Sequence, residues 1–123
     1  MRIVFFIAPP ASPDHPLLGI ASLATMVRDG GHEVVIFDLN AMLFHEEYKD
    51  KSYWQKERFD YWSDPSFIND IKPKLIAMIE GFATQYDNKP DVICFHVNDT
   101  SKAIARFCAH IFNKIYNNTR LVA

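Results

Sequence analysis

Cysteine is scarce in this sequence of 123 residues, which contains only Cys94 and Cys108. Both lie inside apolar segments, and they do not form a CxxC pair. A small disulfide-bonded domain has many more cysteines, and a zinc site has closely spaced ligands. The sequence indicates neither, and we expect two buried free thiols.

Long apolar runs and an excess of one charge are also missing. The first run, residues 3–8, stops at Pro9 and is far shorter than a signal-peptide core or the roughly 20 residues that span a bilayer. We therefore expect a cytoplasmic protein. Lys and Arg total 13 and Asp and Glu total 15, for a formal net charge of -2. No basic stripe exists to follow a phosphate backbone or an anionic membrane, so we expect neither nucleic acid nor membrane as a partner.

The sequence also lacks a glycine-rich phosphate-binding loop. The chain has four glycines, and its first loop has neither a GxGxxG turn nor the GKS or GKT end of a P-loop. These motifs let a pyrophosphate approach the start of a helix closely. We therefore expect neither a dinucleotide nor a nucleoside triphosphate as the ligand.

What is present is the composition of one globular domain, with 49% hydrophobic and 23% charged residues. Residues 2–8 and 33–39 are short runs rich in β-branched and aromatic side chains, which favour buried parallel strands. Between them, residues 17–29 repeat apolar side chains at helical spacing, and Gly30 and Gly31 follow. This pattern predicts a strand, helix, strand unit with a right-handed crossover.

The later elements continue this alternation after one interruption. Residues 41–63 are rich in aromatic and charged side chains, show no strand alternation, and predict an inserted helical excursion. Residues 68–83 carry a helical apolar face, in which Pro73 predicts a kink or a fresh helix start. The series is completed by a third strand, a helix and the start of a fourth strand, at residues 91–97, 103–115 and 120–123.

This order of elements predicts an α/β fold, a three-layer, flavodoxin-like or Rossmann-like parallel sheet formed by residues 1–123 as one domain. Because the sequence stops in the fourth strand, we expect the domain to be truncated there and to be a fragment of a longer chain. In such a sheet, ligands bind beyond the carboxyl ends of the strands, where successive connections pass to opposite faces. Three loops therefore matter most, at residues 9–19, 38–40 and 96–100.

Short motifs along the chain share an order and spacing with a known family. They are Pro9-Pro10, Pro16-Leu17-Leu18-Gly19-Ile20, Leu23-Ala24, Gly31-His32-Glu33-Val34, Asp38-Leu39-Asn40 and Pro90-Asp91-Val92-Ile93. With them the whole chain, and most strongly residues 9–40, resembles the N-terminal cobalamin-binding (Rossmann-like) domain of cobalamin-dependent radical SAM enzymes. In that family this domain holds the corrin over the carboxyl edge of its sheet. A following barrel binds S-adenosylmethionine and a 4Fe-4S iron-sulfur cluster through CxxxCxxC.

The resemblance implies that this fragment binds cobalamin and that its parent is a radical SAM methyltransferase or catalyses a related radical modification. This chain has no CxxxCxxC, so S-adenosylmethionine and the cluster would bind in a downstream barrel of the same chain, and the fragment has no catalytic residue. The implied cofactor-binding residues are Pro10, Ser12, Leu18, Gly19, Asn40, Asn98 and Thr100. The cobalt-ligating motif DxHxxG is not reproduced, because Asp14 and His15 are adjacent. We therefore expect no metal ligand, with His15 as the weaker alternative.

The same residue types also have ordinary structural roles. Prolines make a stiff rim and Gly19 lets backbone approach a flat ligand, but both also suit a loop and a helix start. Asn98 and Thr100 are neutral donors suited to the amide arms of a corrin, and they also suit a helix cap. His96, at the end of the third strand, either faces the ligand edge or, as we expect, is a hydrogen-bonded strand-end residue, and we expect Asp38 to bond locally.

Two other functions stay open. The excursion at residues 41–63 covers the ligand face or docks on the barrel, or it packs as a minor local core. Docking would make the domain a cofactor-free docking or substrate-recognition module of a radical SAM protein. An unrelated flavodoxin-like or receiver-like domain is the last alternative, although Pro9 and Pro10 stand where a receiver has acidic residues.

Overall fold

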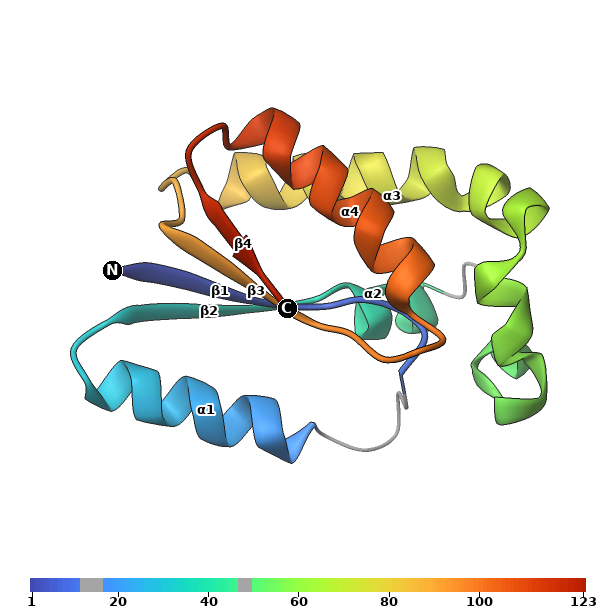
Figure 1. Cartoon of the computed structure of the whole chain (residues 1–123), viewed down its shortest axis with the longest axis horizontal. Helices are drawn as coiled ribbons and strands as arrows, with labels where there is room; N and C mark the ends of the chain where they lie inside the picture. The colour runs from blue at the N-terminus through green and yellow to red at the C-terminus, as the bar shows by residue number, and fades with distance from the viewer. Residues whose placement is uncertain (12–16, 47–49) are drawn as a thin grey trace.

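The computed structural model describes residues 1–11, 17–46 and 50–123 (Figure 1). Four parallel strands form one sheet in the order β2-β1-β3-β4. The strands are β1 (Arg2–Ile7), β2 (Glu33–Asp38), β3 (Val92–His96) and β4 (Arg120–Val122). The helices are α1 (Leu18–Asp29), α2 (Leu39–His45), α3 (Pro65–Gln85) and α4 (Lys102–Ile115), with two 3-10 helices, η1 (Lys51–Trp54) and η2 (Lys56–Ser63). The predicted Rossmann-like or flavodoxin-like parallel α/β fold is confirmed.

The sheet is the middle of three layers. Figure 1 shows α1 along one face of the sheet, with α3 and α4 along the other. Side chains of β1 alternate between the two layers, because successive residues of a strand point to opposite faces. Ile3 and Phe5 pack with Ala24 of α1, whereas Val4 and Phe6 belong to the larger cluster on the side of α3 and α4. Burial on both faces explains why β1 is apolar without interruption.

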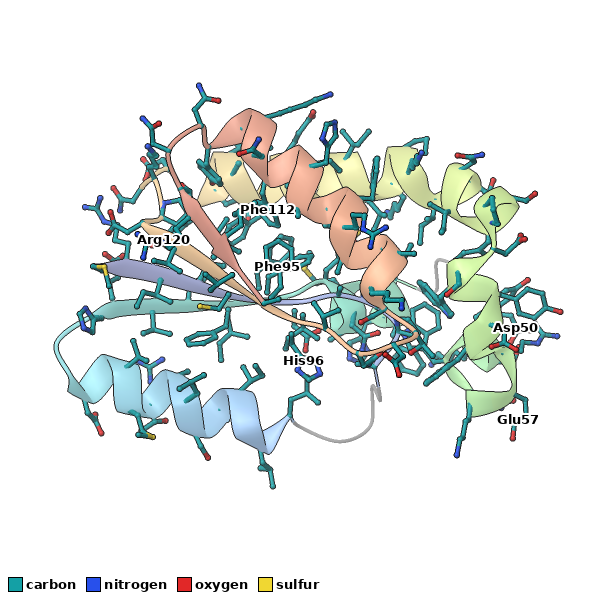
Figure 2. The ribbon with its side chains drawn as sticks, viewed as in Figure 1. Asp50, Glu57, Phe95, His96, Phe112 and Arg120 are labelled. Atoms are coloured by element: carbon teal, nitrogen blue, oxygen red, sulfur yellow. The ribbon has the colours of Figure 1, made fainter. Side chains whose placement is uncertain are left out.

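The larger cluster is built around aromatic rings. Phe6 is fully buried, and its ring meets those of Phe37, Phe95 and Phe112 edge-on, with centroids 5.3, 5.1 and 5.1 Å away. Figure 2 shows Phe95 and Phe112 together between the sheet and α4. Edge-on contacts between rings add to the free energy gained by burying them. Phe6 therefore ties three strands to α4.

Helix α3 contradicts one of the two expectations for Pro73, a fresh helix start. The Asp64 carboxylate caps the helix by accepting a hydrogen bond from the Phe67 backbone N–H at 3.2 Å, and Pro65 occupies the first turn. Pro73 lies inside the continuous helix and does not start a new one. Its ring is exposed, so the carbonyl that loses its N–H partner is within reach of solvent.

The expected excursion is helical, and its first turns, α2, already begin at Leu39. Residues 50–63, hereafter the aromatic segment, form η1 and η2 (green in Figure 1), beyond the carboxyl ends of the strands. Trp54 and Trp62 are buried, with ring centroids 5.0 Å apart, and they belong to the main core cluster. Tyr61, in contrast, is 48% exposed. The segment therefore packs as core through its tryptophans and presents a tyrosine to solvent.

Helix α1 ends at the glycine pair, as predicted. Gly31 has a φ of +92°, in the left-handed region that L side chains rarely adopt. This turn leads directly into β2. Within the described ranges, no helix is both long enough and apolar enough to cross a lipid bilayer.

Candidate functional site

The topology marks one edge of the sheet as the place for a ligand. Strands β1 and β3 are neighbours, with Ile7 opposite His96 at their carboxyl ends. The chain leaves β1 towards α1 on one face and leaves β3 towards α4 on the other (Figure 1). Connections that diverge in this way open a crevice between the two strand ends. We call this region the switch-point edge; it comprises residues 8–11, the first turn of α1 and residues 96–101.

The loop after β1 is tied to the loop after β3. Pro10 is buried, and the bond between Pro9 and Pro10 is cis. The Asn98 side-chain amide donates to the Pro10 carbonyl oxygen at 3.4 Å. Two of the predicted ligand-binding residues, 88 positions apart in the sequence, are therefore brought together at the edge.

Asn40 holds the same loop from the other side. Its Oδ1 accepts the Ala11 backbone N–H at 3.0 Å, and its Nδ2 donates to the Ala11 carbonyl oxygen, also at 3.0 Å. The Trp54 indole Nε1 donates to the same Oδ1 at 2.8 Å. Asn40 is 2% exposed, so the structure gives it a positioning role, and direct contact with a ligand stays a prediction.

Asp38, immediately before α2, bonds locally as predicted. Its carboxylate accepts the Ala41 backbone N–H at 2.8 Å and caps α2. A carboxylate at the start of a helix is favoured there by the exposed backbone N–H groups. The Asp-Leu-Asn sequence therefore caps a helix with its first residue and holds a loop with its third.

Asn98 and Thr100 form a tight turn before α4. Asn98 Oδ1 accepts the backbone N–H groups of Thr100 and Ser101, both at 2.9 Å, and the Thr100 hydroxyl at 2.6 Å. Ser101, and neither Asn98 nor Thr100, occupies the position that precedes α4. The turn uses much of the bonding capacity of both side chains, and Asn98 itself remains exposed.

The first turn of α1 presents an open surface. Leu18 is 71% exposed, and a Cβ built on Gly19 would meet no atom within 4 Å. Packing within the described protein therefore does not require glycine at position 19. A ligand that approaches the α1 backbone would require it.

His96 lines a groove on the α1 face of the sheet. Its side chain extends below the strands towards the start of α1 (Figure 2), and it is half-buried. The groove has a volume of about 350 Å³, and its lining includes Ile20, Leu23, Cys94 and Val122. No hydrogen bond between His96 and another described side chain is observed, so the expected bonding of this histidine stays a prediction.

The two thiols have different surroundings. Cys108 is buried in α4, and burial raises the pKa of its thiol to about 12. Cys94 is half-buried in the groove, and burial raises its pKa as well. Since the thiolate is the reactive form, both thiols should react slowly.

We therefore expect a thiol-reactive dye at pH 8 to modify Cys94 slowly and Cys108 not at all in the folded protein. With a pKa of about 12, only about one Cys108 in ten thousand is ionised at this pH. In denaturant, both thiols should react within the dead time of mixing. Cys94→Ser serves as the control, because it should abolish native labelling; rapid native labelling of that variant would contradict the assignment.

Not all the predicted residues can be placed. Ser12 and His15 lie outside the described residues, so their predicted roles stay untested. The described residues divide into two sets. Leu18 and Gly19 lie at the start of α1, whereas the hydrogen-bonded loops and the start of α2 contain Pro10, Asn40, Asn98 and Thr100. In the described part of the chain, no three His, Cys, Asp or Glu side chains converge as a metal site.

Sequence reasoning missed Trp54 as part of the site. The sequence left open whether this stretch packs as a local core, because its aromatic residues are mixed with charges and follow no clear period. The groove was easier to foresee: Val92, Cys94 and His96 alternate along β3 and so share one face. Which part of that face α1 covers depends on tertiary structure.

A larger groove, of about 820 Å³, lies away from the switch-point edge. It runs between the β2 edge, α2 and α3, and its lining includes Met42, Ala77, Met78 and Gly81. An ion pair between Lys74 Nζ and Glu46, 2.6 Å apart, lies at its wall. None of the predicted ligand-binding residues that the structure describes lines this groove.

No family model matches the sequence, and comparison with curated proteins and with solved structures gave no match either. The function must therefore be inferred from the residues and geometry described above.

Proposed function

We propose that this chain is the cobalamin-binding domain of a radical SAM enzyme and that it holds the corrin at the switch-point edge. The motifs of residues 9–40 support the family, and the observed fold has the element order that the family requires. A bound cobalamin would supply a cobalt atom that carries a methyl group. The proposed partner is a radical SAM barrel with S-adenosylmethionine and a 4Fe-4S cluster.

One observation carries the proposal: a rigid loop and an open surface adjoin at the switch-point edge. Asn40 and Asn98 hold the Pro10–Ala11 backbone from two sides, which lowers the entropic cost of forming the binding shape. At the start of α1, a Cβ built on Gly19 would meet no atom within 4 Å, and the His96 side chain lines the groove between β3 and α1. A flat ligand with peripheral amides fits this combination.

Each described residue has a role in this proposal. Pro10 forms the rim, and Leu18 offers apolar contact area. Gly19 allows the ligand to approach the α1 backbone. His96 and the exposed Asn98 side chain can exchange hydrogen bonds with amide arms. Contacts of Ser12 and Thr100 with the corrin, and ligation of cobalt by His15, stay predictions.

Two glycines with the same local environment test the proposal. Gly19 in α1 and Gly81 in α3 are both helical, and a Cβ at either would meet no atom within 4 Å. Replacing either with leucine should therefore leave the fold intact, because leucine is a better helix former. Only Gly19→Leu places a bulky side chain on the proposed corrin surface. We expect it to weaken the binding of hydroxocobalamin at least about tenfold, with Gly81→Leu unchanged.

Absorbance titration of each variant measures this difference, with circular dichroism as the check on folding. Equal affinities for wild type and Gly19→Leu would place the ligand elsewhere. A loss in Gly81→Leu alone would instead point to the 820 Å³ groove that Gly81 lines.

The second candidate function is a cofactor-free docking module of a radical SAM protein. The aromatic segment favours it, because Arg58 lies over the rings of Tyr53 and Tyr61, at 4.9 and 5.9 Å from their centroids. Tyrosine and arginine are enriched at protein interfaces. Failure of folded protein to retain any corrin would favour this candidate.

A further inference from the structure

Trp54 connects the aromatic segment to the loop after β1, residues 8–11. Its ring is 6% exposed and packs on Trp62 and Phe44, with centroids 5.0 and 5.4 Å away. The only polar group of this side chain is the indole N–H, which donates a hydrogen bond to Asn40 Oδ1 at 2.8 Å. The tryptophan is therefore fixed in both position and orientation.

Asn40 links Trp54 to Ala11 through hydrogen bonds. Oδ1 accepts from both Trp54 and the Ala11 backbone N–H, while Nδ2 donates to the Ala11 carbonyl oxygen. One buried amide thus joins the first turn of α2, the loop after β1 and the aromatic segment. The indole N–H helps to hold the Asn40 amide in the orientation that both bonds to Ala11 require. Loss of the indole donor should therefore loosen the two bonds that hold Ala11.

The connection reaches the surface on the other side of Trp54. The Trp62 indole Nε1 donates to the Tyr53 carbonyl oxygen at 2.8 Å, and the rings of Tyr53 and Tyr61 lie 5.6 Å apart. Tyr61 is 48% exposed. The segment that holds the buried Trp54 thus also presents an exposed tyrosine at the surface.

We propose that Trp54 and Asn40 are positioning residues of the switch-point edge, through which the aromatic segment sets the shape of the Ala11 loop and hence its affinity for ligand. The ligand's identity rests on the proposed function above, whereas the positioning role does not. Coupling of this kind is reciprocal, so ligand bound at the edge also stabilises the Trp54 contact.

The test compares Trp54→Phe with Trp62→Phe. Each variant loses one indole N–H that makes a 2.8 Å hydrogen bond and keeps an aromatic ring, but only Trp54 contacts Asn40. Hydrogen exchange of the Ala11 amide is measured without ligand, relative to exchange of β1 amides that open only on global unfolding. We expect Ala11 exchange to accelerate about tenfold in Trp54→Phe beyond any global change, and not in Trp62→Phe.

A merely structural role would affect both variants alike, so equal acceleration, or none in Trp54→Phe, would overturn the proposal. Hydroxocobalamin titration is the second readout, and Trp54→Phe should bind about tenfold more weakly than Trp62→Phe. If wild type binds no corrin but Ala11 exchange behaves as expected, the proposed function fails and the positioning role stands. If corrin binds equally to both variants, the coupling to affinity is refuted.

Discussion

Replacing Phe6 with alanine should lower the free energy of unfolding by about 4 kcal/mol, a large part of the stability of a small domain. The side chain is fully buried, and three rings surround it at centroid distances of 5.1 to 5.3 Å. Its removal would leave a cavity bounded by β2, β3 and α4, none of which can collapse without disturbing the sheet. Urea unfolding followed by circular dichroism measures the loss.

The matched control is Met26→Ala on α1, where the side chain is 70% exposed. This substitution should change the stability by less than about 0.5 kcal/mol. A loss in Phe6→Ala that is no larger than in the control would show that the aromatic cluster is not the core of the domain.

Replacing Asn40 with alanine should cost about 3 kcal/mol, because each buried polar group left without a partner carries a desolvation penalty. The substitution orphans the Ala11 N–H, the Ala11 carbonyl and the Trp54 indole N–H together. The cost should exceed that of an ordinary surface asparagine, even though few atoms are removed. Urea unfolding again provides the measurement.

Asn88→Ala is the control for this substitution, since Asn88 is exposed and follows α3. It should be near neutral. If Asn40→Ala unfolds at the same urea concentration as Asn88→Ala, water replaces the three lost bonds, and Asn40 does not position the loop.

Periodicity was sufficient to predict the fold because the signals were local. The run from Ile3 to Ile7 is apolar on both faces, as a central parallel strand requires, and Gly31 marks the turn into β2. The helices on either side of β3 were foreseen from their apolar stripes. Pro73 left the start of α3 undecided, because a proline whose unpaired carbonyl faces water is tolerated inside a long helix.

The site was predicted less well because its bonds join distant residues. Asn40 stood at a strand exit, where the sequence suggested contact with a ligand, yet its partner Ala11 is 29 positions away. No local pattern reports that approach. Similarly, the pairing of Trp54 with Asn40 depends on how the aromatic segment returns to the sheet edge.

Desalting the protein after mixing with hydroxocobalamin, and recording the absorbance of the eluted fraction, tests the central claim most directly. We expect a corrin spectrum retained in proportion to protein, with the base-off form in both wild type and His15→Ala, because the chain lacks the DxHxxG motif. Folded protein that elutes without any corrin spectrum would contradict the claim that this domain binds cobalamin.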